Sequence, residues 1–276
     1  MELGIFAKTF RRPTVGATLE AAKALGLGCV QFNFECAGLF SMPETVPPST
    51  LRAIASASRE TGIRLAALSA TFNMAHPDRQ RRELGVRRLR VVAQAAAGLG
   101  VPLLTLCSGT RDREDMWREH PDNRSRQAWT DLLETMEKAL AVAADSGVDL
   151  AIEPERANVV YGADQARALL DTLQAGPLLR VILDPANLPE EPGALMKAFD
   201  LLGADIALAH AKDRQSDGQA CALGRGLVDF DAYFGMLRRA GFRGPVIMHG
   251  FDESEALEST AFIRRKLQKV QADAVH

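Results

Sequence analysis

One type of junction recurs seven times along the chain and constrains its fold more than any other feature. At each junction a segment with helical periodicity ends near a glycine, and a short apolar run begins within a few residues. A glycine just past a helix end can adopt the left-handed conformation that terminates the helix and turns the chain. The seven glycines are Gly26, Gly62, Gly100, Gly147, Gly176, Gly203 and Gly241.

Strands that alternate with amphipathic helices indicate βαβ units and a parallel sheet. The opening run at residues 3–6 adds an eighth strand, and the last helix is expected over residues 254–271. Eight such units in 276 residues predict an α/β fold, a (β/α)8 TIM barrel that forms a single domain over residues 1–276. The alternative is a doubly wound open sheet, whose nucleotide-binding forms carry a Gly-rich loop after the first strand. Here that junction reads FAKTFRRPT.

The composition excludes several classes of function. The formal net charge is -2 and the basic run at residues 79–90 has helical spacing, so we expect no nucleic acid partner. Four scattered cysteines without a C-x-x-C pair indicate a reducing compartment. We see no signal peptide and no apolar run of ~20 residues, so we expect a cytoplasmic protein with no membrane partner.

Four consecutive predicted strands each end in a side chain that can bind a metal. They read DLAIE, LRVILD, IALAH and PVIMH, and they end in Glu153, Asp184, His210 and His249. Barrel active sites lie at the C-terminal ends of the strands. Two carboxylates close together resist joint ionisation, whereas a divalent cation removes that cost and takes imidazoles as neutral ligands. We therefore predict a shared metal site; the alternative is a salt-bridge cluster with Lys212 and Arg225.

The predicted cofactor is one divalent metal ion. Two oxygen and two nitrogen ligands suit Mn²⁺, Zn²⁺, Co²⁺ or Fe²⁺ better than Ca²⁺. We take Mn²⁺ as the first expectation and Zn²⁺, Co²⁺, Fe²⁺ or Mg²⁺ as alternatives, because the residue types do not choose among them.

The segments LAIEPE, VILDPANL, AHAKD, LGRGLVDF and PVIMHG resemble the xylose isomerase-like superfamily of sugar isomerases and epimerases, and the resemblance covers nearly the whole chain. It implies a (β/α)8 barrel with one divalent metal held by Glu, Asp, His and Glu on strands five to eight. The first three positions correspond to Glu153, Asp184 and His210. The resemblance also implies that Arg225 contacts substrate hydroxyls. Asn187 stands where many members have a histidine that supports the metal site or binds substrate.

The fourth position departs from the family, because His249 stands where a glutamate is usual. In the family's epimerases, two metal-bound glutamates flank the substrate; one removes a proton beside a carbonyl and the other returns it. This chain keeps only the first of that pair. The resemblance therefore does not fix the reaction.

The predicted site can support enediolate chemistry, in which a metal polarises a carbonyl and a base removes the adjacent proton. Glu153 is the candidate base. Lys212 is a candidate acid, since it lies two residues after His210 and is directed to the same side of an extended chain. Its alternative role is a salt bridge to Asp184 or Asp213.

Two loops are expected to add substrate contacts. His76 follows the third strand; its alternative is a role at a helix start or on the surface. The long polar loop within residues 107–129 would cover the pocket, where Arg111 would bind a carboxylate or phosphate and Trp117 would stack on a sugar face. The alternative is a loop held by its own salt bridges. Because no Gly-rich phosphate loop is evident, we favour a non-phosphorylated or carboxylate-bearing substrate.

The predicted function is that of a metal-dependent isomerase or epimerase of a small sugar, keto sugar or sugar acid, acting through an enediolate. One alternative is a metal-dependent lyase that dehydrates a keto sugar or cyclitol, and another is a non-catalytic sugar-binding relative. A DNA-repair nuclease is disfavoured by the charge balance. The expected partner is a small carbohydrate, and the prediction leaves a homo-oligomer open.

Overall fold

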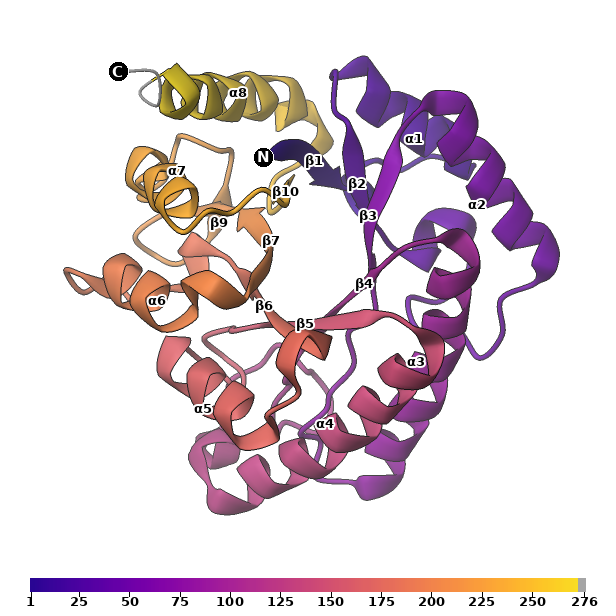
Figure 1. Cartoon of the computed structure of the whole chain (residues 1–276), viewed down its shortest axis with the longest axis vertical. Helices are drawn as coiled ribbons and strands as arrows, with labels where there is room; N and C mark the ends of the chain where they lie inside the picture. Colours follow the sequence, from indigo (N-terminus) through magenta and orange to yellow (C-terminus); the bar gives the residue numbers. More distant parts are fainter. Residues whose placement is uncertain (273–276) are drawn as a thin grey trace.

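The computed structural model describes residues 1–272, which form a closed parallel barrel with helices around it (Figure 1). The strands follow the order β1-β10-β7-β6-β5-β4-β3-β2, and β1 pairs with both β10 and β2 to close the ring. The predicted (β/α)8 TIM barrel is thereby confirmed. The barrel strands are β1 (Glu2–Phe6), β2 (Cys29–Phe32), β3 (Arg64–Ser69), β4 (Leu103–Cys107), β5 (Asp149–Glu153), β6 (Leu179–Leu183), β7 (Ile206–Ala211) and β10 (Pro245–Met248).

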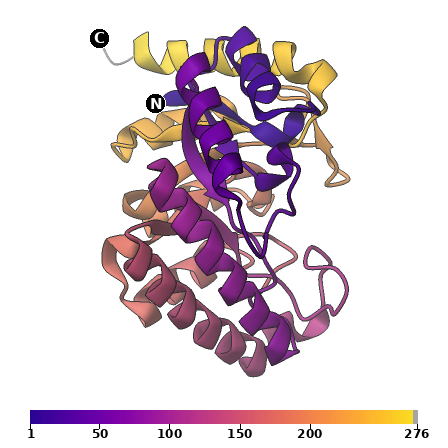
Figure 2. The ribbon, with the colours of Figure 1, turned by 90° about the vertical axis from the view of Figure 1, so that its right-hand side faces the viewer.

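Each barrel strand is followed by an α-helix, and helices that succeed one another lie side by side on the outside, as α3 and α4 do (Figure 2). The helices are α1 (Val15–Ala24), α2 (Pro48–Thr61), α3 (Arg79–Leu99), α4 (Arg126–Ser146), α5 (Ala163–Leu173), α6 (Ala194–Leu202), α7 (Phe230–Arg239) and α8 (Ala256–Ala272). A short hairpin of β8 (Asp213–Arg214) and β9 (Ala220–Cys221) lies outside the barrel sheet.

The sequence of α4 shows why these segments become helices. The side chain of Ser125 accepts a hydrogen bond from the amide of Ala128, which caps the first turn. Leu132, Met136 and Ala139 then recur at helical spacing and are fully buried. Within residues 1–272, none of the helices is both long enough and apolar enough to span a membrane.

Five of the seven junction glycines behave as predicted. They have positive φ at or just after a helix end: Gly26, Gly62, Gly100, Gly147 and Gly241. The other two need correction. Helix α5 ends at Gln174, which takes the left-handed conformation itself (φ 47°), and Gly176 follows it. Gly203 is right-handed (φ -55°), because the chain continues from α6 directly into a 3-10 turn.

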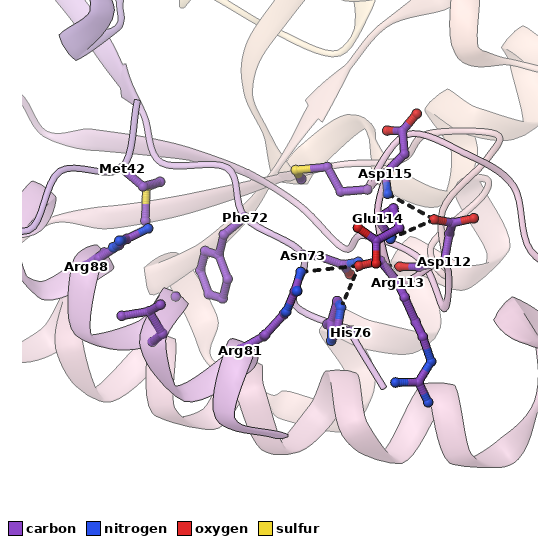
Figure 3. A pocket seen from close by; sticks show the side chains of 13 residues that line it. Met42, Phe72, Asn73, His76, Arg81, Arg88, Asp112, Arg113, Glu114 and Asp115 are labelled. Carbon is purple, nitrogen blue, oxygen red and sulfur yellow. Dashed lines mark hydrogen bonds between the residues drawn. The ribbon is translucent and has the colours of Figure 1, made fainter. Parts of the chain in front are cut away.

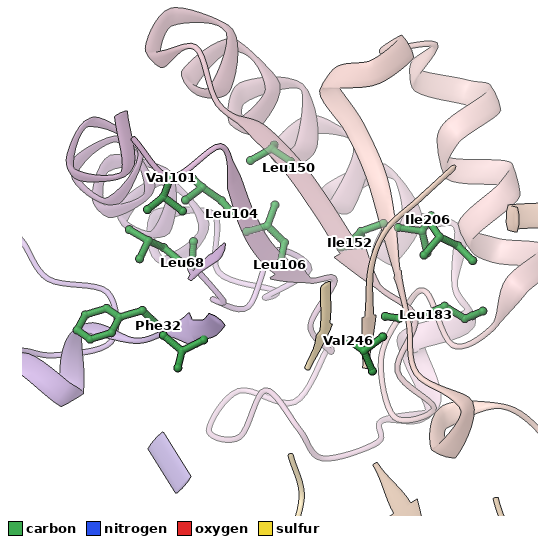
Figure 4. Packing of buried hydrophobic residues seen from close by; sticks show 14 of the residues in the cluster. Phe32, Leu68, Val101, Leu104, Leu106, Leu150, Ile152, Leu183, Ile206 and Val246 are labelled. Atoms are coloured by element: carbon green, nitrogen blue, oxygen red, sulfur yellow. The ribbon is translucent and has the colours of Figure 1, made fainter. Parts of the chain in front are cut away.

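Two separate apolar layers hold the barrel together. The larger one lies between strands and helices and contains alternate strand residues such as Leu150, Ile152, Leu183 and Val246 (Figure 4). The smaller one fills the barrel interior with side chains of the opposite face: Cys29, Ala66, Ala67, Leu103, Ala151, Ile182, Leu208 and Ile247. The interior is tightly packed, since a Cβ atom at Gly4 would lie 2.6 Å from the sulfur of Cys29. The inner layer forms the floor on which the candidate site rests.

Candidate metal centre

The candidate site is the next layer of side chains above the apolar interior. Side chains on a strand alternate between faces, so a residue two positions after an interior residue points the same way. Seven residues of the barrel interior are each followed, two positions later, by a polar residue. We call these seven polar residues the polar layer: Gln31, Ser69, Thr105, Glu153, Asp184, His210 and His249. Six of the seven line a cavity of about 460 Å³; Asp184 adjoins it through His249.

Four residues of this layer offer metal-ligand atoms that all lie within 4.8 Å of one another. They are Glu153, Asp184, His210 and His249, which we call the four-residue cluster. Nδ1 of His210 lies 3.1 Å from Oε1 of Glu153. Nε2 of His249 lies 3.2 Å from Oδ2 of Asp184. The strand ends therefore bring the four predicted ligands together.

The cluster fits a single divalent ion. Atoms about 2.1 Å from one metal ion lie at most roughly 4.2 Å apart, so a pair of ligand atoms at the 4.8 Å limit would have to approach by at least ~0.6 Å. Two carboxylates supply the charge that balances a divalent cation, and two imidazoles complete a set of borderline hardness. Asp184 presents Oδ2 to the cluster, because its Oδ1 accepts a hydrogen bond from the amide of Ala186 (2.9 Å).

The surroundings favour the ionised form of both carboxyl groups. Burial alone would raise the pKa of Glu153, but the adjacent His210 outweighs it and the pKa lies below the ordinary range. Burial opposes ionisation of Asp184 as well, yet Lys212 and His249 hold its pKa well below the usual value. Both groups are thus ready to bind a cation at neutral pH.

His249 is kept in the form that a metal requires. Burial, followed by the neighbouring His210, lowers the pKa of His249 below its ordinary value, despite the opposing effect of Asp184. The two imidazole rings lie close together, with 4.3 Å between their centroids. A neutral ring is the ligating form.

Lys212 and Asn187 connect the two carboxylates. Nζ of Lys212 lies 2.7 Å from Oδ1 of Asn187 and 3.4 Å from Oδ2 of Asp184. The amide nitrogen of Asn187 donates to Oε1 of Glu153 at 3.1 Å. Of the two predicted salt-bridge partners of Lys212, Asp184 is the one that it contacts. The oxygens of Asp213 instead accept hydrogen bonds from backbone amides, among them those of Gly224 and Gly226.

Four residues predicted to bind substrate do not line this cavity. One is Asn187, whose side chain instead contacts Lys212 and Glu153. His76 lines a separate hollow of about 380 Å³, where its Nε2 meets the carbonyl of Arg113 at 3.1 Å and its Nδ1 accepts from the amide of Asp78 at 2.9 Å (Figure 3). Both ring nitrogens are therefore used near the start of α3, which corresponds to the alternative role for this residue.

The other two are held by ion pairs away from the cavity. Arg111 is mostly buried, with its Nη1 2.5 Å from Asp131 and 2.9 Å from the carbonyl of Ala75. Arg225 is exposed and pairs with Glu258 at 2.7 Å. Of the alternative salt-bridge cluster, the contact of Lys212 with Asp184 is formed, whereas Arg225 takes no part. The structure gives no support to a substrate role for either arginine.

The β4–α4 loop reaches the cavity through Met116 and Trp117. Trp117 is 51% exposed, so its ring stands at the rim and is free to meet a ligand. The opposite wall contains groups that strand-end reasoning missed: Lys8, Asn33, Glu35 and Ser41, together with Glu155 beside the cluster. These groups give the cavity the hydrogen-bonding character that a polyhydroxylated ligand needs.

Comparisons with known proteins find a family model and a curated relative that match most of this chain. Residues 19–266 match the model of a family described as xylose isomerase-like TIM barrel. An L-ribulose-5-phosphate 3-epimerase of Escherichia coli is 23% identical over 207 residues, which cover 73% of this chain and 70% of the relative.

Solved structures with the same fold include several sugar epimerases. The 3-keto-D-glucoside 4-epimerase of E. coli has a TM-score of 0.79 at 17% identity and covers 96% of this chain and 99% of its own. The D-allulose 3-epimerase of Methylomonas sp. with bound D-allulose has a TM-score of 0.76 at 18% identity, with 96% and 97% covered. The IOLI protein, crystallised with a zinc atom, has a TM-score of 0.76 at 17% identity, with 98% of each chain covered.

Proposed function

Because the chain belongs to the xylose isomerase-like TIM barrel family, we propose that it is a metal-dependent isomerase or epimerase of a small keto sugar or sugar acid. The observation that carries the proposal is the four-residue cluster, with ligand atoms within 4.8 Å of one another, beside a polar cavity of about 460 Å³. The similar proteins named above include epimerases of L-ribulose-5-phosphate and of a 3-keto-D-glucoside, which supports a keto sugar as substrate.

Glu153, Asp184, His210 and His249 are the proposed ligands of one divalent ion. When bound, such an ion would polarise a substrate carbonyl and stabilise the enediolate that forms when the adjacent proton is removed. Its identity stays open between Mn²⁺, our first expectation, and Zn²⁺, Co²⁺, Fe²⁺ or Mg²⁺.

Glu153 is the proposed base. Its Oε1 is engaged by His210 and Asn187, whereas its Oε2 has no hydrogen bond to any of the described residues 1–272. The side chain lines the cavity, so this second oxygen is available to a substrate C–H bond. A base in this position accounts for ~10²- to 10⁴-fold of rate in comparable reactions.

Lys212 is the second proposed catalytic residue. Burial would lower its pKa, but Asp184, Glu153 and Glu155 outweigh that effect and raise it to about 12. The ammonium group therefore stays charged at neutral pH and is suited to hold negative charge on a substrate oxygen. A group with so high a pKa is poorly matched to proton return at carbon, because general acids work best with a pKa near the operating pH.

The proposed site thus has one well-placed carboxylate base. If Glu153 returns the proton to the neighbouring carbon on the same face, while the hydroxyl proton passes to the former carbonyl oxygen, the reaction is an isomerisation between aldose and ketose. Inversion at one carbon requires delivery from the opposite face by a second group. The arrangement favours isomerisation as the first reaction to test.

The test is incubation of the metal-loaded protein with a panel of ketoses, 3-keto sugars and sugar acids in deuterated water. We expect a product of unchanged formula that carries at most one deuterium at carbon, in proportion to exchange of the proton on Glu153 with solvent, and loss of the reaction when the metal is chelated. Glu153→Gln should abolish exchange, whereas Glu35→Gln, on the opposite wall of the cavity, should retain it. Loss of water from the substrate would instead support a lyase. Absence of any reaction with every metal would support a sugar-binding protein.

A further inference from the structure

Gln31 is a buried polar residue whose side chain crosses the barrel interior. It lies on β2, is 6% exposed, and contacts three other strands. Its Oε1 lies 2.8 Å from Nε2 of His210 on β7. Its Nε2 donates to Oγ of Ser69 at 3.1 Å and to Oγ1 of Thr105 at 3.2 Å, on β3 and β4. Every polar atom of the amide is therefore used.

With the amide oriented in this way, Gln31 favours hydrogen on one particular nitrogen of His210. A carbonyl oxygen only accepts, so the contact with Oε1 requires hydrogen on Nε2 of His210. In the neutral ring the lone pair is then on Nδ1. Nδ1 is the atom that faces Glu153 and the four-residue cluster, at 3.1 Å. The carboxylate of Glu153 is a competing acceptor at Nδ1, so a ring that keeps hydrogen on Nε2 is the one that can offer its Nδ1 lone pair to a cation.

If the Gln31 amide were turned the other way, its hydrogen bonds would also be satisfied, but it would favour the other tautomer of His210. If the amide were rotated by a half-turn, its nitrogen would donate to His210 and the hydroxyls of Ser69 and Thr105 would donate to Oε1, since a hydroxyl can donate or accept. His210 would then carry hydrogen on Nδ1, and a hydrogen bond to Glu153 would replace the lone pair that a metal needs. The orientation of this amide therefore decides whether His210 can bind a metal.

We propose that Gln31 is a positioning residue that sets the tautomer of His210 and so prepares the cluster for a divalent cation. The inference rests on the metal site of the proposed function. The carboxamide acts through His210 without touching the ion or the substrate. Groups that hydrogen-bond a metal-ligating histidine fix its ring and tautomer, and their loss typically costs 10- to 100-fold in metal affinity.

Two substitutions of Gln31 separate this role from simple packing. Gln31→Met keeps the volume and removes both polar atoms, so it should weaken Zn²⁺ binding roughly 10- to 100-fold in calorimetric titration. Gln31→Glu offers only acceptors to His210, so it should bind Zn²⁺ at least as tightly as the native protein. A packing role predicts the reverse order, because methionine is tolerated in a core and an added buried carboxylate is not. Thr105→Val is the matched control and should change affinity about threefold or less, because Ser69 still accepts from the amide.

Nitrogen NMR of the metal-free protein reads the tautomer directly. The chain has five histidines, and His210 is assigned by the signals missing from His210→Gln. The native protein and Gln31→Glu should carry hydrogen on Nε2, whereas in Gln31→Met it should move toward Nδ1. If Gln31→Met does not fold, the double variant Ser69→Ala/Thr105→Val takes its place, because loss of both acceptors should turn the amide nitrogen toward His210 and weaken Zn²⁺ binding.

Native affinity and an unchanged tautomer in Gln31→Met, or in the double variant, would overturn the role of Gln31 and leave the metal site standing. Absence of Zn²⁺ binding by the native protein would overturn the metal site and this inference together.

Discussion

The ammonium nitrogen of Lys212 lies 3.4 Å from Oδ2 of Asp184, whose side chain is fully buried. The same oxygen lies 3.2 Å from Nε2 of His249. Before any metal binds, Lys212 is the nearest full positive charge to this carboxylate among the described residues. The cluster can therefore form in a metal-free protein without two unbalanced buried carboxylates.

This ion pair predicts how stability depends on pH in the metal-free protein. The pKa of Lys212 in the folded state, about 12, lies above the ordinary value of 10.5. A raised pKa stabilises the folded state below the ordinary pKa, and that contribution is lost as the pH rises toward the folded value. The free energy of unfolding of the native protein should exceed that of Lys212→Met most at pH 8, by on the order of 2 kcal/mol. The difference should shrink between pH 10.5 and 12.

Urea unfolding of both proteins in the presence of a chelator, at pH 8 and at pH 11.5, measures that difference. The comparison cancels other groups that titrate at high pH, because both proteins contain them. If the difference in free energy of unfolding between the two proteins stays constant over this range, the carboxylates do not stabilise the charged form of Lys212.

Trp117 is predicted to contribute to substrate binding and little to stability. It stands 51% exposed at the rim of the cavity. Its replacement by alanine should raise KM roughly 2- to 12-fold, since an aromatic contact contributes about 0.5–1.5 kcal/mol, and should leave kcat nearly unchanged. Phe40→Ala is the control, because Phe40 is 84% exposed and does not line the cavity. Equal KM values for the two variants would remove Trp117 from the binding site.

Replacement by alanine is predicted to have opposite effects on stability at two glycines of α3. A Cβ atom at Gly85 would lie 2.0 Å from the ring of Phe72, whereas a Cβ atom at Gly98 would meet nothing within 4 Å. Alanine favours a helix by ~0.5–1 kcal/mol relative to glycine, so Gly98→Ala should raise the thermal midpoint slightly. At Gly85 the clash should outweigh this gain and destabilise by about 1–3 kcal/mol. Calorimetry of both variants decides; a stabilised Gly85→Ala would show that α3 packs less closely on Phe72.

His249→Glu tests what the unusual fourth position does. A third carboxylate beside Glu153 and Asp184 adds like charge to a buried site, so the metal-free variant should unfold at lower temperature. Saturating Mn²⁺ should then raise its thermal midpoint more than that of the native protein, because the cation neutralises the extra charge. A midpoint that Mn²⁺ does not shift in either protein would place residue 249 outside any metal site.

The barrel and the four-residue cluster could be predicted from sequence because both follow from strand periodicity. Once β5, β6 and β7 are recognised, Glu153, Asp184 and His210 fall at the same edge of the sheet. The same reasoning could have found Gln31, Ser69 and Thr105. Each lies two residues after a residue of the barrel interior. A polar residue at that spacing in an apolar strand therefore predicts a side chain that points into the candidate site.

Loop residues could not be placed in the same way. His76 and Arg111 follow strands, as the site residues do, but their positions depend on hydrogen bonds made far along the chain. Arg111 is fixed by Asp131 on α4, and His76 by the carbonyl of Arg113. Gly203 shows a related limit, since the residues after it, and not the glycine alone, decided that the chain would continue into a 3-10 turn.

Metal binding by the native protein, compared with two variants, tests the central claim most directly. The protein is stripped with a chelator, dialysed against Mn²⁺ or Zn²⁺, and its metal content and affinity are measured. We predict one ion per chain, a loss of affinity of at least ~100-fold in Asp184→Asn, and little loss in Glu155→Gln, whose carboxylate lies in the cavity outside the cluster. Absence of bound metal in the native protein, or equal affinity in Asp184→Asn, would contradict the account.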